Sequence, residues 1–311
     1  MKKVIYVLII FIFVFSCIEI FCRIFNIGKT YSDERNTLYQ YDNYLGWMPI
    51  PNITATISNS TQQREYKHNS LGFRDIEHDY NNKTKKRIMF IGDSFCYGYG
   101  VSQNEVFTEL LRNKLLDFEL FNCGVSGYGS DQEYLLLEKY YTIIKPDIIF
   151  LLFCDNDMLD NTLNNNYNGY YKPYIIKQQD NLILKGTPVP KSWLYYRYNF
   201  FVKYSRFNNF MLETFIRIKN PSLSLKNYEI TGDIYNEIIK FCNLCNCQLI
   251  ICIAKDDENN FKQILKDNNL FFLNLENNNV RSTTDLHWNK KGHEYVADKI
   301  YNFLKEENII N

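Results

Sequence analysis

The sequence predicts an α/β protein with a central parallel sheet, preceded by one transmembrane helix. From Lys86 onward, short apolar runs alternate with segments whose apolar residues repeat at helical spacing, which is typical of a parallel sheet with helices on its faces. The run "PDIIFLLFC" (Pro146–Cys154) is almost continuously apolar, as expected for a strand covered on both faces. At the N-terminus, Val4–Ile18 is uncharged, and Val4–Phe21 nearly reaches the roughly 20 apolar residues of a spanning helix.

Composition and charge describe a folded chain and give no sign of a nucleic-acid partner. Of the 311 residues, 46% are apolar and 23% are charged, a balance that supplies a sizeable core and argues against a disordered chain. The formal net charge is zero, and the sequence has no basic cluster with interleaved aromatic residues. The length suits one large domain or two small ones.

The N-terminal apolar run predicts a membrane anchor over residues 1–24. Lys2 and Lys3 should stay on the cytoplasmic side, so the chain from about residue 25 should be extracytoplasmic, as in a single-pass membrane protein. A cleavable signal peptide is the rival interpretation, but no small-x-small cleavage site follows the run. The letters "VFSC", which end at Cys17, resemble a poor lipoprotein signal. An uncleaved anchor is favoured, and cleavage and lipidation stay open.

We expect residues 25–85 to form a turn-rich lead-in segment and residues 86–311 the main domain. In the lead-in, "YLGWMPIPN" and "HNSLGFRD" flank a polar, Thr-rich stretch that is typical of a hairpin. The strands of the main domain are predicted at "RIMFIG", "FELFNCG", Pro146–Cys154, "CQLIICIA" and "LFFLNL". Its helices are predicted at Asn104–Leu116, Ser130–Ile144, Asp233–Leu244, Asn259–Lys266 and Gly292–Lys305.

One segment, at about residues 159–232, interrupts this alternation. It is too long for an ordinary connection, which indicates an insertion with its own helix at roughly Leu194–Ile218. The Tyr and Trp residues between 167 and 198 fit a sugar-binding cleft or, equally well, the packing of the insertion itself.

The nine cysteines point to core packing rather than to a metal site. The stretch "CNLCNC" (Cys242–Cys247) has a CxxC spacing, but a zinc site would need a second pair or nearby histidines, and none follows. Core cysteines at a helix-to-strand junction are the favoured interpretation. No metal or organic cofactor is expected.

Ser94 stands where a reactive serine would be presented. In open parallel sheets, sites form beyond the carboxyl ends of the strands, and "RIMFIG" ends two residues before Ser94. A serine nucleophile needs a base, and the base needs an acid that orients it. Asp285 and His287 lie two residues apart in the loop before the last helix, so the carboxylate can fix the tautomer of the imidazole. The alternative is that Ser94 only caps a helix.

Four blocks around these residues resemble the SGNH hydrolases, also called the GDSL family. "GDSFCYGYGV" is similar to the nucleophile block, "NCGVSGYGSDQ" to the second block, "FCDNDMLDN" to the third and "DLHW" to the fifth. The resemblance covers about two thirds of the chain, from Gly92 to His287. It implies a three-layer α/β/α, flavodoxin-like fold. The segments "YLGWMPIPN" and "NSLGFRD" also resemble those that precede the catalytic domain in membrane-anchored members.

The resemblance also implies a role for each site residue. Ser94 would be the nucleophile, His287 the base and Asp285 the acid. The oxyanion hole would consist of the backbone N–H groups of Ser94 and Gly127 together with the side-chain amide of Asn156. Such donors, fixed in advance, stabilise the negative oxygen of an acyl-transfer transition state.

Two blocks depart from the family pattern. Cys154 stands where the third block normally has Gly, and Asp155 follows it, which would narrow the site or add a charge near it. The fifth block is normally DxxH, whereas this chain has DxH followed by Trp288, a form that resembles SGNH-like proteins that O-acetylate exported polysaccharides. His293, on the last predicted helix, is interpreted as a partner or surface residue.

These features predict a serine esterase or acyltransferase, held outside a membrane by one helix, that acts on O-acyl groups of extracytoplasmic glycans. Water as acceptor would give a deacylase and a sugar hydroxyl a transferase, and the triad alone does not separate the two. A lipid or small-ester esterase is the second candidate. A non-catalytic, membrane-tethered glycan-binding protein with the same fold is the third.

Overall fold

The apolar runs of the main domain form one five-stranded parallel sheet. The computed structural model describes residues 2–28, 37–58, 63–166, 169–179, 181–197, 199–223, 230–268, 270–283 and 286–310. The strands are β5 (Lys86–Gly92), β6 (Phe118–Asn122), β7 (Ile148–Cys154), β12 (Gln248–Lys255) and β13 (Phe272–Asn274), in the spatial order β13-β12-β7-β5-β6. The order reverses between β5 and β7, and such a switch point is where ligands bind in doubly wound sheets.

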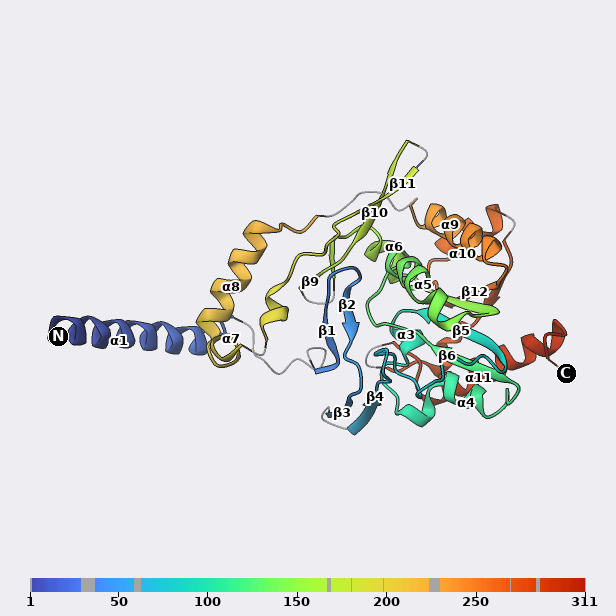
Figure 1. Cartoon of the computed structure of the whole chain (residues 1–311), viewed down its shortest axis with the longest axis horizontal. Coiled ribbons are helices and arrows are strands. Elements are labelled where there is room, and N and C mark those ends of the chain that lie inside the picture. Colours follow the sequence, from blue (N-terminus) through green and yellow to red (C-terminus); the bar gives the residue numbers. More distant parts are fainter. Residues whose placement is uncertain are drawn as a thin grey trace.

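Helices cover both faces of this sheet, which confirms the predicted three-layer α/β/α fold (Figure 1). Alternate side chains of β7 point to opposite faces, because the side-chain period of a strand is two. Ile149 and Leu151 lie in one core cluster, and Phe150 and Leu152 lie in the other. The first cluster is closed by α5 (Ser130–Ile144), α9 (Ile230–Leu244) and α10 (Asn260–Asp267), and the second by α4 (Phe107–Arg112) and α11 (Lys290–Glu306).

The N-terminal helix α1 (Lys2–Ile24) projects away from the rest of the molecule (Figure 1). At about 1.5 Å per residue it is roughly 34 Å long, enough to cross the hydrocarbon core of a bilayer. Among the residues that the structure describes, it is the one helix long and apolar enough to do so. Within it, Cys22 is the buried residue.

The lead-in segment forms two antiparallel pairs of strands. The first consists of β1 (Tyr39–Asp42) and β2 (Gly46–Pro49), and the second of β3 (Thr54–Ser58) and β4 (Gln63–Lys67). The second pair lies in the Thr-rich stretch for which a hairpin was predicted. Leu45, Trp47 and Phe73 of this segment are buried in the same core cluster as α5, so the lead-in packs as part of the main domain.

The insertion contains several short elements, and the helix predicted at roughly Leu194–Ile218 is divided into a 3₁₀ turn and two separate helices. The observed elements are β8 (Asn165–Asn166), β9 (Tyr170–Tyr171), β10 (Tyr174–Gln178), β11 (Asn181–Lys185), a 3₁₀ turn at Trp193–Tyr196, α7 (Phe200–Tyr204) and α8 (Arg206–Lys219). Asn199 accepts a hydrogen bond from Phe201 N and caps α7, and Ser205 accepts one from Asn208 N and caps α8. These polar caps restart the helix twice, which the apolar periodicity alone does not reveal.

Candidate active site

Ser94 is presented at the carboxyl end of β5 by a tight turn. It begins the short helix α3 (Ser94–Tyr97), which Asp93 caps by accepting a hydrogen bond from Phe95 N at 2.9 Å. The turn requires glycine at position 92, because a Cβ there would lie 2.8 Å from Cys96 Cβ. The neighbours of Ser94 on both sides are buried, whereas Ser94 itself is partly exposed. The chain therefore presents a partly exposed hydroxyl just after β5, between residues that are buried.

The structure brings Ser94 and His287 together. Ser94 Oγ lies 2.7 Å from His287 Nε2, across 193 residues of sequence. The imidazole packs against the rings of Phe95 and Tyr99, with ring centroids 5.0 Å away in each case. Ser94 Oγ also lies 3.2 Å from Asp93 Oδ2, but the hydroxyl has one proton, and the shorter contact is the one with the histidine. This distance is within the reach that proton transfer needs.

Asp285, the predicted acid, lies outside the described residues together with Thr284. Its contact with the imidazole therefore stays a prediction. The loop on either side of it is closed, because Ser282 N donates a hydrogen bond to the carbonyl of His287 at 2.7 Å. Arg281 also forms an isolated antiparallel bridge with Trp288.

Gly127 lies in a turn that runs beside the nucleophile segment. Val125 N donates to the carbonyl of Gly92 at 3.0 Å, which places this turn next to the residues that lead into Ser94. Gly127 has a φ of 81°, a conformation that side chains other than glycine rarely adopt. Its carbonyl accepts a hydrogen bond from Asn166 Nδ2 at 3.1 Å. Because that contact uses the carbonyl, it does not involve the backbone N–H for which an oxyanion role was predicted.

The lead-in segment supports this same turn. Trp47 Nε1 donates to the carbonyl of Ser126 at 3.1 Å, and Tyr128 Oη donates to the carbonyl of Trp47 at 2.5 Å. Gln132 Nε2 donates to the carbonyl of Leu45 at 2.7 Å. Residues of the lead-in segment thus hold the second block in position through these three hydrogen bonds.

Asn156 is the first residue of α6 (Asn156–Asp160), directly beyond the end of β7. Its Nδ2 donates to Asp160 Oδ2 at 3.0 Å. The same Nδ2 also lies 3.5 Å from Asp157 Oδ1 and hydrogen-bonds to the side chain of Asp93, so the amide is held among carboxylates. Asn156 is partly exposed, whereas Asp157 and Asp160 are buried. Asp160, which accepts this hydrogen bond, was not among the predicted site residues.

Several of the acidic side chains beneath the site are buried, and Lys172 of the insertion reaches them. Burial raises the pKa of Asp160 to about 7, although its hydrogen bond from Asn156 and the charge of Lys172 act in the opposite direction. Burial also raises the pKa of Asp93 and, well above its usual range, that of Glu133. Lys172 Nζ, which is fully buried, lies 2.5 Å from Asp131 Oδ2 and donates to the carbonyl of Asp160 at 3.0 Å.

The charge of Asp155 is neutralised by an ion pair. Lys255 Nζ, at the end of β12, lies 2.7 Å from Asp155 Oδ2 and 3.4 Å from Asp257 Oδ2. Asp257 in turn lies 3.1 Å from the guanidinium of Arg281. Burial is the largest single influence and alone would lower the pKa of Lys255, but the hydrogen bond to Asp155 and the negative charges of Asp155 and Asp257 together raise it. This chain of ion pairs links the ends of β7 and β12 to the loop that carries His287.

A groove of about 800 Å³ runs past the loop that carries His287. Its lining is mostly polar and includes Ser102, Ser282 and Trp288. Its charged residues are Arg64, Glu105, Arg281, Lys290 and Lys291. Cations therefore outnumber carboxylates along its walls. In the described parts of the chain, no three His, Cys, Asp or Glu side chains converge in a way that could hold a metal ion.

The profile of the GDSL-like lipase/acylhydrolase family matches residues 88–300. The chain belongs to this family. The solved structures that it resembles include the esterase EstA from a Pseudoalteromonas species, with 16% identity, a TM-score of 0.45 and coverage of 73% of this chain and 100% of that one. Another is an acetyl xylan esterase, AlAXEase, with 14% identity, a TM-score of 0.41 and coverage of 70% and 99%. The comparison with curated proteins gives no match.

Membership of the GDSL family makes the chain an enzyme of the serine hydrolase type, in agreement with the resemblance of its four blocks. The matched region contains Ser94, Gly127, Asn156 and His287, whose roles remain predictions.

One histidine of this GDSL domain differs from expectation. His293, interpreted above as a partner or surface residue, is buried. Its Nδ1 accepts a hydrogen bond from Phe107 N at 3.3 Å, and its ring packs against Trp288. Burial lowers the pKa of His293 to about 3, so the ring is neutral and structural. The interpretation failed because the contact joins α11 to α4, far apart in the sequence.

Proposed function

We propose that this chain is a membrane-anchored serine esterase or acyltransferase that works through an acyl-serine intermediate. The observation that carries the proposal is the 2.7 Å contact between Ser94 Oγ and His287 Nε2. A serine hydroxyl this close to a neutral imidazole nitrogen can lose its proton as it attacks a carbonyl carbon.

The proposed reaction has two steps. Ser94 Oγ bonds to the carbonyl carbon of the ester while His287 Nε2 takes the hydroxyl proton, and the tetrahedral intermediate then expels the alcohol, which takes that proton back. In the second step His287 takes a proton from water or from a sugar hydroxyl, whose oxygen attacks the acyl carbon. The serine oxygen leaves and is reprotonated by His287. Asp285 would hold the imidazole in the right tautomer throughout.

The developing oxyanion would be stabilised by three donors. These are the backbone N–H groups of Ser94 and Gly127 and the side-chain amide of Asn156. The hydrogen bond from Asn156 to Asp160 supports this role, because it fixes the direction of the amide before a substrate binds.

We propose an O-acylated glycan, with an acetyl group as the favoured acyl group, as the substrate class. The polar, cation-bearing groove beside the His287 loop supports a hydroxyl-rich or anionic chain, since a long lipid acyl chain would need an apolar channel instead. Water as the acceptor would give hydrolysis, and a sugar hydroxyl would give acyl transfer.

We propose that α1 crosses a membrane once, with Lys2 and Lys3 on the cytoplasmic side and the rest of the chain outside. Its length and its exposed apolar side chains support this topology. The division into an anchor at 1–24, a lead-in at 25–85 and a GDSL domain at 86–311 with an insertion at about 159–232 belongs to the same proposal.

Covalent labelling tests the mechanism. A fluorophosphonate probe should label the full-length protein in detergent micelles, and Ser94→Ala should abolish both labelling and the cleavage of p-nitrophenyl acetate. Ser70→Ala, which removes a serine hydroxyl bonded to Glu77 outside the site, is the matched control and should be labelled normally. Absence of labelling in the folded wild type would favour the non-catalytic binding protein. If the wild type is labelled, release of acetate from an acetylated glycan would identify water as the acceptor, and transfer to an added glycan would identify a sugar hydroxyl.

A further inference from the structure

The exposed side of α8 is apolar, which is unusual for a helix that faces water. Phe207, Met211, Phe215 and Ile218 recur at intervals of three or four residues and therefore form one stripe along the helix. The buried residues of α8, Asn209 and Ile216, lie on the opposite side. Phe215 is 63% exposed and Ile218 is 78% exposed.

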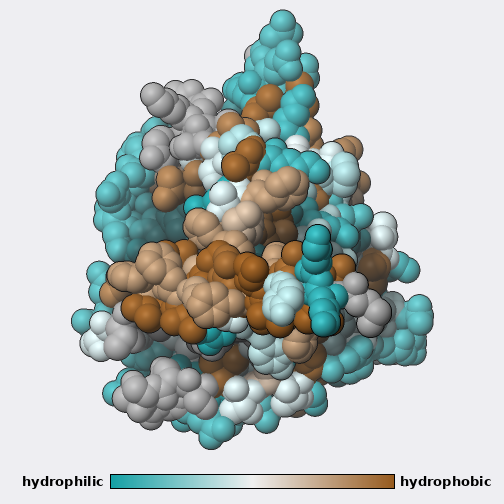
Figure 2. Space-filling model, turned by 90° about the vertical axis from the view of Figure 1, so that its left-hand side faces the viewer, coloured by the Kyte–Doolittle hydropathy of each residue, from teal (hydrophilic) through white to brown (hydrophobic). Residues whose placement is uncertain are grey.

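The neighbouring helix α7 continues this apolar surface. Phe200 and Phe201 are 68% and 67% exposed, and Tyr204 is also exposed. Figure 2 looks onto this end of the molecule, from which α1 projects toward the viewer, and shows hydrophobic residues gathered there. We call α7 and α8 together, residues 200–219, the apolar platform. Exposed apolar surface that is this continuous usually marks a contact with a partner or a membrane.

The helix α1 is docked directly onto the platform. Glu19, the acidic residue within its apolar run, accepts hydrogen bonds from Ser205 Oγ at 2.9 Å and from the backbone N–H groups of Arg206 and Phe207 at 3.1 Å each. The carboxylate of α1 therefore caps the N-terminus of α8, where the helix dipole favours a negative charge. Phe15 of α1 also packs edge-on against Phe207, with centroids 5.9 Å apart.

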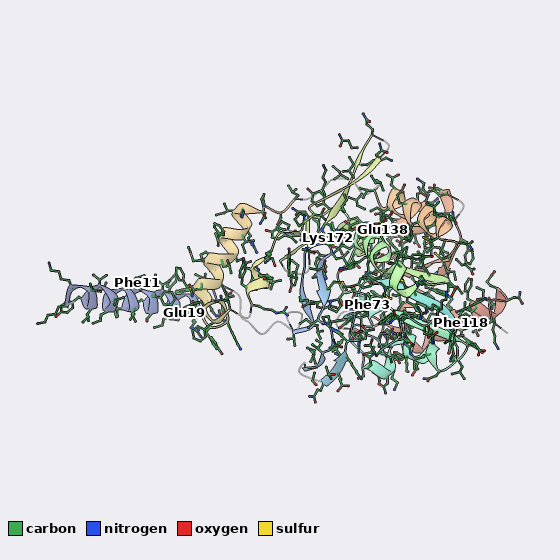
Figure 3. The ribbon with its side chains drawn as sticks, in the orientation of Figure 1. Phe11, Glu19, Phe73, Phe118, Glu138 and Lys172 are labelled. Atoms are coloured by element: carbon green, nitrogen blue, oxygen red, sulfur yellow. The ribbon has the colours of Figure 1, made fainter. Side chains whose placement is uncertain are left out.

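Contacts made by the C-terminal end of α1 and the turn after it also hold α1 against α7 and α8. A Cβ at Gly28 would lie 2.3 Å from the carbonyl oxygen of Arg206, so the turn after α1 passes in direct contact with α8. Arg23 Nη2 donates to the carbonyl of Tyr204 at 2.7 Å. Figure 3 shows Glu19 where α1 meets the platform and Phe11 on the projecting part of α1.

The two helices are also oriented as a membrane span and a surface helix would be. In Figure 1, α8 runs across the end of α1 rather than along it. If α1 stands across the bilayer, α8 lies close to the plane of the membrane surface, with its apolar stripe on the side of α1. Lys203, Arg217 and Lys219 are exposed on the same two helices and would lie at the level of the lipid phosphates.

We propose that the apolar platform rests in the interfacial layer of the same phospholipid bilayer that α1 crosses. This inference goes beyond the proposed chemistry and rests on the proposal that α1 spans the membrane. The platform is expected to contact lipid because it adjoins α1. If α1 enters the bilayer just beyond Glu19, the same bilayer reaches the exposed rings of α7 and α8. In Figure 1, α3 and α6 lie on the side of the sheet nearer the platform, so the platform holds the edge of the sheet with the candidate site toward the membrane.

Depth-dependent fluorescence quenching tests the platform in the full-length chain. The protein is reconstituted at one copy per phospholipid nanodisc, with or without lipids brominated near the top of the acyl chain. The native tryptophans, Trp47, Trp193 and Trp288, are buried at 0%, 5% and 1% exposure and give a constant background. Phe215→Trp should add fluorescence that is mostly lost in brominated discs. Leu244→Trp, at an 87% exposed position at the end of α9, is the matched control and should keep its added fluorescence.

A third variant separates failure of the platform from failure of the anchor. Phe11→Trp, on the exposed part of α1, reports whether α1 enters the bilayer. Quenching of Phe11→Trp with no quenching of Phe215→Trp would overturn the platform and leave the anchor in place. No quenching of either variant would overturn both. A blue-shifted but unquenched Phe215→Trp would mean that protein covers the stripe, which also rejects the lipid assignment.

Discussion

Ser94 and His287 meet in the candidate site, but different kinds of contact hold the two halves. Ser94 begins a helix that packs directly on the sheet, and its neighbours Phe95 and Tyr97 are buried in the core. His287 lies in a loop beyond the sheet, closed by a hydrogen bond from Ser282 N and tied to β12 through the ion pair of Arg281. The nucleophile half is thus built by core packing. The base half relies on polar contacts in the loop before His287 and joins the core through the imidazole, which packs on Phe95 and Tyr99, and through the buried Trp288.

This difference predicts separate consequences for stability and for rate. Core packing is shared with the whole domain, so a change in the nucleophile half should affect folding first. Polar contacts in a partly exposed loop contribute little to overall stability, but they set the position of the imidazole, and small displacements of a catalytic group lower the rate. The following variants test that separation, from the largest expected effect to the smallest.

Removal of the base should have the largest effect. His287→Ala should lower kcat for p-nitrophenyl acetate by about 10⁴–10⁶-fold, because Ser94 keeps its position but loses its proton acceptor. The melting temperature should stay close to that of the wild type. Steady-state kinetics and thermal melting measure the two quantities. A large drop in melting temperature would show that the His287 loop belongs to the folding core after all.

Removal of the proposed oxyanion donor should have the next largest effect. Asn156→Ala should lower kcat by about 10²–10³-fold with little change in KM, since the amide would act mainly in the transition state. Asn260→Ala, at an exposed position that starts α10, is the control and should keep full activity. A variant with normal kcat but reduced stability would mean that Asn156 serves only its hydrogen bond to Asp160.

A methyl group at Gly124 should damage the nucleophile half through folding. A Cβ there would lie 2.3 Å from Tyr97 N, a backbone atom that no side-chain rotation can move away. Gly124→Ala should therefore destabilise the protein by about 1–3 kcal/mol, measured by chemical unfolding. Gly232→Ala, in α9, is the control. A Cβ at Gly232 would meet only Ile264 Cγ2, at 3.4 Å, so this variant should stabilise the protein by about 0.5–1 kcal/mol. Equal effects of the two variants would contradict the packing argument.

The sheet was predictable from sequence because its strands are short apolar runs with clear ends. Pro146–Cys154 indicated a strand buried on both faces, and β7 is that strand. The helix predicted at Ser130–Ile144 matches α5, whose apolar residues recur at helical spacing. The helix predicted at Asn104–Leu116 is shorter in the structure, because a 3₁₀ turn at Gln103–Glu105 precedes α4.

The proximity of Ser94 and His287 was also predictable, because the family blocks occur in the expected order. What surrounds the pair was not, since it depends on contacts between distant segments. Nothing in the sequence linked Lys172 of the insertion to Asp131, or Asp155 to Lys255. At the split of the insertion helix, Ser205 Oγ donates a hydrogen bond to Glu19, which is 186 residues away.

The smallest expected effect belongs to the ion pairs behind the His287 loop. Lys255 holds Asp155 and Asp257 together, and Asp257 holds Arg281 at the start of the loop. Lys255→Met keeps the length of the side chain but removes its charge. Because a partly exposed ion pair contributes up to about 1 kcal/mol, the loss should lower kcat by about two- to fivefold.

Two further variants test whether the loss of rate comes from the missing charge at position 255 in particular. Lys255→Arg keeps the cation and should restore most of the rate, whereas Lys240→Met breaks an exposed ion pair with Glu237 on α9 and should leave kcat unchanged. High salt should slow the wild type toward the rate of Lys255→Met, because salt screens partly exposed charges. If Lys255→Met instead lowered the melting temperature as much as Gly124→Ala, the base half would share the core of the nucleophile half. The two halves of the site would then be a single packed unit.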